Sequence, residues 1–171
     1  WGCRGMNLVR DLPPIKPNLP QGTDPADLTV LTAPDCPAAI WSRQHSEALS
    51  VWLDRLPASQ LPRWRETVVV EEVSDAVRDA CAEAGTPEGA ERDELITEIQ
   101  MLADTFAVLM KISALLLRLD VITSNACKRF HIDAVSARAL RRSRHCPICL
   151  TRCQSGRSRA ADAPYPAFWL L

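Results

Sequence analysis

The sequence predicts an α+β fold: a mostly helical N-terminal body with one long buried helix, followed by strands. Apolar residues recur at steps of three and four between residues 87 and 119, which is typical of a buried helix. Two shorter segments before it share that spacing, whereas residues 130–135 suit a strand. The 171 residues, 47% hydrophobic and 24% charged, are enough for one domain with a real core.

Residues 1–38 are predicted to form a proline-rich, extended arm. Proline fixes its own φ and moves the preceding residue out of the helical region, so closely spaced prolines favour a loop-like backbone. The prolines of this arm are Pro13, Pro14, Pro17, Pro20, Pro25, Pro34 and Pro37. One short strand is expected within it, at residues 28–31.

The first helix is predicted over residues 42–56. Ser42 can cap its N-terminus, Pro57 stops it, and the apolar residues between them follow the spacing of one helical face. The β-branched segment at 67–70 is expected to be either a strand or the lead-in to the next helix.

Two further helices are predicted after this segment. The first covers residues 74–84 and is followed by Gly85, where a C-terminal glycine belongs. The second begins at Pro87, after a Thr86 cap, and continues to residue 119. Its apolar positions include Leu95, Ile99, Leu102, Phe106, Leu109 and Leu116. A helix that is apolar over most of its circumference is buried on most sides, so this helix is expected to form the centre of the core.

The His131-x-Asp133 pair is the most promising chemical feature. Positions i and i+2 of a strand share a face, so both side chains are expected to point the same way. Two such ligands can hold one metal ion, and a distant histidine would complete the 2-His-1-carboxylate face of a non-haem iron site. The alternative is a histidine that is merely hydrogen-bonded to a nearby carboxylate.

The residues around this pair resemble the core signature of a bacterial family of unknown function, DUF1826. The matching run is Asn125-x-Cys127-x-x-Phe130-His131-x-Asp133-x-Val135-x-x-Arg138, and the early Ile40-Trp41-x-Arg43 also fits. The resemblance covers roughly residues 38–138. We therefore divide the chain into the arm (1–38), a family-like domain portion (39–138) and a tail (139–171).

The resemblance implies a context of zinc homeostasis, shared with zinc-metallochaperone GTPases. It also implies a C-terminal half like the cupin and 2-oxoglutarate-oxygenase β-barrels, in which a later histidine meets His131 and Asp133 at an iron or zinc ion. Arg138 would then anchor an acidic co-substrate, since a guanidinium binds a carboxylate through two hydrogen bonds.

The sequence departs from the family's pattern after Leu140. Seven arginines and no acidic residue lie between residues 134 and 161, with cysteine, serine and proline among them. We expect this segment either to be disordered or to be translated from a shifted reading frame. The barrel would then be incomplete, the third ligand missing and the chain inactive.

A zinc knuckle in this tail is the alternative metal site. Cys146-x-x-Cys149 has the spacing of a zinc half-site, and Cys153 and His145 could supply further ligands. Two observations count against this zinc knuckle. Adjacent His145 and Cys146 would be strained as ligands of one ion, and the sequence contains no second half-site.

Composition narrows the remaining function classes. The most apolar stretch is interrupted by charged residues, so no membrane span is expected. The odd number of cysteines, seven, and the lack of a secretory leader favour a cytoplasmic location. The net charge of −1 and the lack of basic and aromatic interleaving give no reason to expect a nucleic-acid partner. Three hypotheses remain: a metal-binding protein that is an oxygenase-like enzyme in its full-length form, a non-enzymatic zinc-homeostasis accessory, and a small zinc-knuckle binding module.

Overall fold

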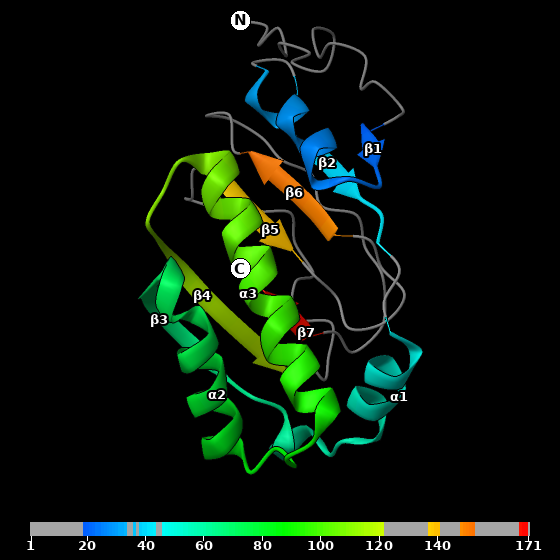
Figure 1. The fold of residues 1–171 in the computed structure, drawn as a ribbon, viewed down its shortest axis with the longest axis vertical. Coiled ribbons are helices and arrows are strands. Elements are labelled where there is room, and N and C mark those ends of the chain that lie inside the picture. The colour runs from blue at the N-terminus through cyan, green and yellow to red at the C-terminus, as the bar shows by residue number, and fades with distance from the viewer. Residues whose placement is uncertain are drawn as a thin grey trace, which may run out of the picture.

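The fold was analysed in a computed structural model, which describes residues 19–33, 36, 38–43, 46–121, 137–140, 148–152 and 168–170. Helices and strands are mixed along the chain, which confirms the α+β class (Figure 1). In chain order the elements are β1 (Gln21–Gly22), η1 (Pro25–Thr32), β2 (Ala38–Trp41), α1 (Glu47–Arg55), η2 (Ala58–Gln60), β3 (Trp64–Val69), η3 (Val70–Glu72), α2 (Val73–Ala84), α3 (Ala90–Met110), β4 (Ala114–Val121), β5 (Ala137–Leu140), β6 (Ile148–Arg152) and β7 (Phe168–Leu170).

The strands form two small sheets. Sheet A has the order β1-β2-β6-β5, and sheet B has the order β3-β4-β7. Among the described strands, β1 and β2 pair parallel, and the other pairs in both sheets are antiparallel. The cupin-like barrel stays a prediction, because residues 122–136, which hold the predicted first barrel strand, lie outside the described residues.

Helix α3 runs through the middle of the molecule, with α2 beside it and α1 at its N-terminal end (Figure 1). Leu95 and Ile99 are fully buried on it, and Leu102 nearly so. Their neighbours in the core come from η1, β2, α1, α2, β3 and β4. The prediction that this helix forms the centre of the core is confirmed.

The predicted end of that helix is wrong. Helix α3 stops at Met110, Lys111 adopts a left-handed conformation with φ of 54°, and β4 begins at Ala114. Leu117 and Leu119 are buried whereas Leu116 is 46% exposed, which is the alternation of a strand rather than the stripe of a helix. Pairing with β3 fixes this conformation, because β4 supplies the ladder for every residue from Trp64 to Val69. The helix also begins at Ala90 rather than Pro87.

Three local predictions have different outcomes. The helix over 74–84 is confirmed as α2, which begins one residue earlier and ends at Gly85 in the left-handed region, with φ of 67°. The first helix is shorter than predicted, because Ser46 rather than Ser42 caps it by accepting a hydrogen bond from the Leu49 amide at 3.2 Å. The prediction of a strand at 28–31 is wrong, since these residues lie in η1. Asp24 and Asp27 cap the N-terminus of η1.

The segment predicted as a strand or helix lead-in, 67–70, falls mainly in β3, which starts earlier at Trp64. No helix within the described ranges combines the length and the apolar character needed to cross a bilayer.

Substitutions at the two residues with left-handed backbone, Gly85 and Lys111, should change the free energy of unfolding in opposite directions. Ala in place of Gly85 meets no atom within 4 Å, so its cost is the left-handed backbone itself, about 1 kcal/mol. Lys111→Gly removes the same kind of strain and should raise the free energy of unfolding by about 0.5 kcal/mol. Urea denaturation of the two variants measures both changes, and a shift of the same sign in both would contradict this assignment.

Candidate functional site

The structure describes only part of the predicted site. His131 and Asp133, and His145, Cys146 and Cys153 of the alternative site, lie outside the described residues. Arg138 and Cys149 have described backbones, in β5 and β6 respectively. Their positions in sheet A therefore follow from the strand register.

Register places Arg138 and Cys149 on neighbouring strands. Arg138 pairs with Thr151, which pairs in turn with Ala38 of β2. Cys149 pairs with Leu140 on one side and with Ile40 on the other. The family-like segment and the tail thus meet in one sheet, and Cys149 occupies a strand position with a partner strand on each side.

A described polar cluster joins this sheet to α3. The Arg43 guanidinium, just after β2, lies 3.6 Å (Nη2 to Oε1) from the Glu98 carboxylate in the middle of α3. The two side chains are 16% and 10% exposed. The guanidinium carbon of Arg43 also lies 4.9 Å from the ring centroid of Trp41, close enough for a cation–π contact.

Local structure fixes the orientation of Trp41. Its indole Nε1–H donates to the Thr23 carbonyl at 3.1 Å, and the ring is buried. The Arg43 guanidinium contacts both this ring and Glu98, and its Nη1 is buried with no hydrogen-bond partner among the described residues. Because arginine stays protonated in proteins, the group can bind a carboxylate or carbonyl but cannot transfer a proton.

Gln100, two residues after Glu98 on α3, makes a second polar connection. Its side-chain oxygen accepts from the Ser74 amide at 2.8 Å, which satisfies a free N–H at the start of α2. Its amide nitrogen donates to the Val70 carbonyl and to Asp104, each at 2.8 Å. This network orients α2 on α3 and contains no histidine or cysteine, so we read it as structural.

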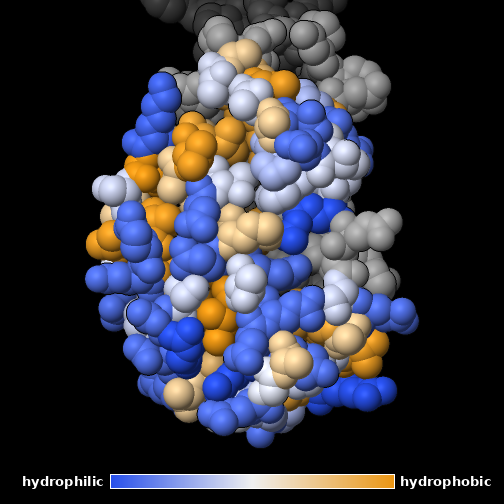
Figure 2. All heavy atoms as spheres, in the orientation of Figure 1, coloured by the Kyte–Doolittle hydropathy of each residue, from blue (hydrophilic) through white to orange (hydrophobic). Residues whose placement is uncertain are grey.

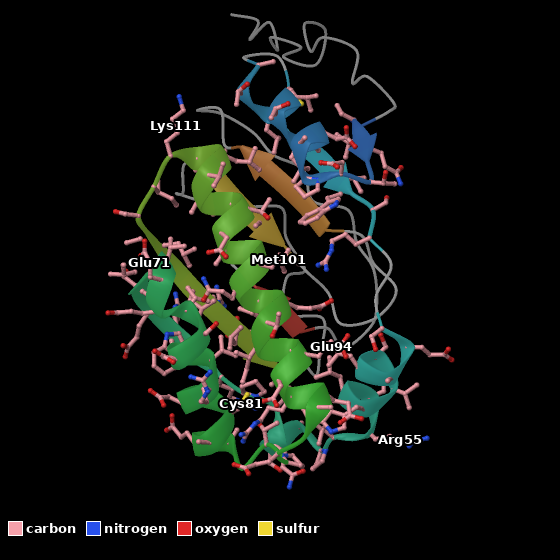
Figure 3. All side chains as sticks on the ribbon, in the orientation of Figure 1. Arg55, Glu71, Cys81, Glu94, Met101 and Lys111 are labelled. Carbon is pink, nitrogen blue, oxygen red and sulfur yellow. The ribbon has the colours of Figure 1, made fainter. Side chains whose placement is uncertain are left out.

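Cys81 lies between α2 and α3 with its side chain in the core (Figure 3). Burial raises the pKa of the Cys81 thiol, although a hydrogen bond with Thr86 and the charge of Arg92 act in the opposite direction. A thiol that stays protonated is a weak nucleophile and a poor metal ligand. Cys81 is therefore a core residue.

A shallow groove of about 470 Å³ lies between α1 and the start of α3. Figure 3 labels Arg55 at its edge. Its lining consists of Glu47, Ala48, Val51, Trp52, Arg55 and Glu91. None of these is a histidine or cysteine, and across the described residues no three His, Cys, Asp or Glu side chains are placed to hold a metal ion.

Sequence reasoning found Trp41 and Arg43 only as part of a resemblance and missed Glu98. The available signal was the acidic residue itself, which interrupts the apolar run between Leu95 and Leu102. A buried carboxylate at such a position requires a cation from another element.

Comparison with protein families gives a match over most of the described chain. The family model described as "Protein of unknown function (DUF1826)" matches residues 22–141. The matched range includes the cluster of Trp41, Arg43 and Glu98, and it also includes His131, Asp133 and Arg138. It ends before Cys146. No curated protein and no solved structure matches the chain.

Removing Arg43 should destabilise the protein through Glu98. In Arg43→Met the stacking on Trp41 is weakened and the Glu98 carboxylate stays nearly buried, at a cost of about 2 kcal/mol in the free energy of unfolding. A double-mutant cycle with Glu98→Gln should give a coupling energy of about 1 kcal/mol. Additive effects in urea denaturation would show that the two side chains do not interact.

The raised pKa of the Cys81 thiol predicts that the protein loses stability in alkaline solution. The folded state holds the thiol protonated, whereas the unfolded chain ionises it above about pH 8.5, its ordinary pKa. Unfolding therefore releases a proton, and stability falls as the pH rises through that value. The Cys81→Ala variant should lose less stability between about pH 7.5 and about pH 9.5, a range that spans that ordinary pKa. An identical slope in the two proteins would refute the assignment.

Proposed function

Because this chain belongs to the DUF1826 family, whose function is unknown, we propose that its function resides in the His131-x-Asp133 pair and that the pair binds a divalent metal ion. The observation that supports the proposal is the extent of the family match, which includes both residues and ends before the tail cysteines. An imidazole and a carboxylate together form a donor set that suits iron(II) or zinc.

His131 and Asp133 would hold the ion, and two protein ligands leave coordination positions open for further ligands. Arg138 follows Asp133 by five residues and would bind the carboxylate of an acidic co-substrate. A bound metal would supply Lewis-acid or redox chemistry. The body around α3, tied to sheet A by Arg43 and Glu98, would serve as the rigid support.

An oxygenase-like enzyme is the first form of this proposal, and a non-enzymatic accessory in zinc homeostasis is the second. Both use the same two ligands. Oxygen consumption that depends on a 2-oxo acid and on iron(II) supports the enzyme, whereas metal binding without it supports the accessory.

The zinc knuckle of Cys146, Cys149, Cys153 and His145 is a weaker proposal. A knuckle places its two cysteines on a tight turn, so that both thiolates reach one ion. Cys149 instead has extended backbone in β6, paired with β2 and β5. This observation favours the His131 site, although the chain contains enough thiolates for the alternative to be tested.

Two of the three histidines of the chain provide a matched test. His131→Ala should weaken binding of zinc or cobalt(II) at least about ten-fold, because it removes one of two protein ligands. His45→Ala is the control, since it removes a histidine of no proposed role. Metal content by mass spectrometry and a cobalt(II) titration give the affinities independently of any activity.

The cobalt(II) spectrum also distinguishes the two sites. Thiolate ligands give an intense charge-transfer band in the near ultraviolet, and nitrogen and oxygen ligands do not. A spectrum without that band, unchanged in Cys146→Ser, is expected. Metal affinity that is unaffected by His131→Ala but lost in Cys146→Ser would overturn the proposal in favour of the knuckle.

A further inference from the structure

Strand β3 is an edge strand of sheet B. Its only partner among the described residues is β4. Four of its six residues are exposed, including Arg65, Thr67 and Val69. An edge of this length presents unpaired backbone N–H and C=O groups, to which another strand can be added.

The register with β4 fixes which groups face outward. The Val70 amide donates to the Ser113 carbonyl at 2.9 Å, so this pair is of the hydrogen-bonded type. Hydrogen-bonded and non-bonded pairs alternate along an antiparallel ladder. Val68, Glu66 and Trp64 therefore bond to β4. The backbone groups of Arg65, Thr67 and Val69 point away from it.

We propose that β3 is the interface of a homodimer, in which it pairs antiparallel with β3 of a second copy about a twofold axis at Thr67. In this register Thr67 faces Thr67 of the second copy, and Arg65 faces its Val69. These are the three residues whose backbone groups point outward, so each facing pair exchanges two hydrogen bonds. The two three-stranded sheets then become one continuous sheet.

Charge complementarity selects this register. The same symmetry brings Arg63, just before β3, to the end of the paired strands where Glu71 of the second copy lies in η3, directly after its β3. Both residues are exposed, and Glu71 lies at the margin of the molecule beside β3 (Figure 3). Moving the axis by one residue to Glu66 would oppose two carboxylates, which is destabilising. Moving it to Val68 leaves only residues 67–69 paired within the strands.

Exposed apolar side chains accompany the edge. Val69 is 44% exposed and Leu116, the β4 partner of Thr67, is 46% exposed on the same face of sheet B. Figure 2 shows hydrophobic side chains along the margin where β3 and β4 lie. In the dimer, Leu116 and Thr67 of the two copies form one row across the new sheet. A single strand pair is smaller than the roughly 800 Å² per partner of a standard interface, so the dimer should dissociate reversibly.

The oligomeric state of the full chain tests the proposal. Sedimentation equilibrium should show a reversible monomer–dimer exchange at concentrations on the order of 100 µM or below. Thr67→Pro should abolish it, because proline removes an outward N–H that β4 does not use. A wild-type chain that stays monomeric overturns the proposal, and so does a dimer that persists in folded Thr67→Pro.

Charge exchange gives a second test that does not depend on how the proline variant folds. Arg63→Glu should raise the dimer dissociation constant at least about ten-fold by facing Glu71 with a like charge. The double variant Arg63→Glu/Glu71→Arg should restore the constant to within about three-fold of wild type. Arg55→Glu on α1, outside the interface, is the matched control and should change nothing (Figure 3). Failure of the double variant to restore the dimer would overturn the Thr67 axis.

Discussion

Burial of α3 is the constraint on which the described fold depends. Its apolar residues face several directions, so no single partner can remove them from water. Sheet B and α2 cover one side, and α1, η1 and β2 contribute to the others. The buried carboxylate of this helix, Glu98, is accommodated because sheet A brings Arg43 and Trp41 to it. The packing of the two sheets is therefore linked through one helix.

The sequence predicted the centre of the fold well and its boundaries less well. Spacing alone identified α2, its Gly85 terminus and the buried face of α3, because local signals and tertiary packing agree there. The stop at Lys111 could not be predicted in this way. Leucines at 115, 116, 117 and 119 satisfy a helical stripe as readily as a strand, and only the ladder with β3 decides between them.

For the candidate site too, local features could be predicted from the sequence, whereas contacts between distant segments could not. A short motif such as His131-x-Asp133 can be recognised from residue types, since the chemistry is contained in adjacent positions. The contact of Arg43 with Glu98 joins residues far apart in the chain, and nothing in either local sequence specifies the other. Register likewise brings Arg138 and Cys149 into neighbouring strands, although the chain had been divided between them.

Sheet A has a consequence for how the chain folds. Its central pair joins Ala38 to Thr151 and Trp41 to Ile148, so two segments separated by on the order of a hundred residues must meet before the sheet exists. Closing so long a loop carries a large entropic cost, whereas α2, α3 and the β3–β4 pair form from segments much closer along the chain. During synthesis, residues 46–121 can therefore collapse first and leave β2 exposed until β6 emerges. That interval, rather than the equilibrium state, is when this protein depends most on protection from aggregation.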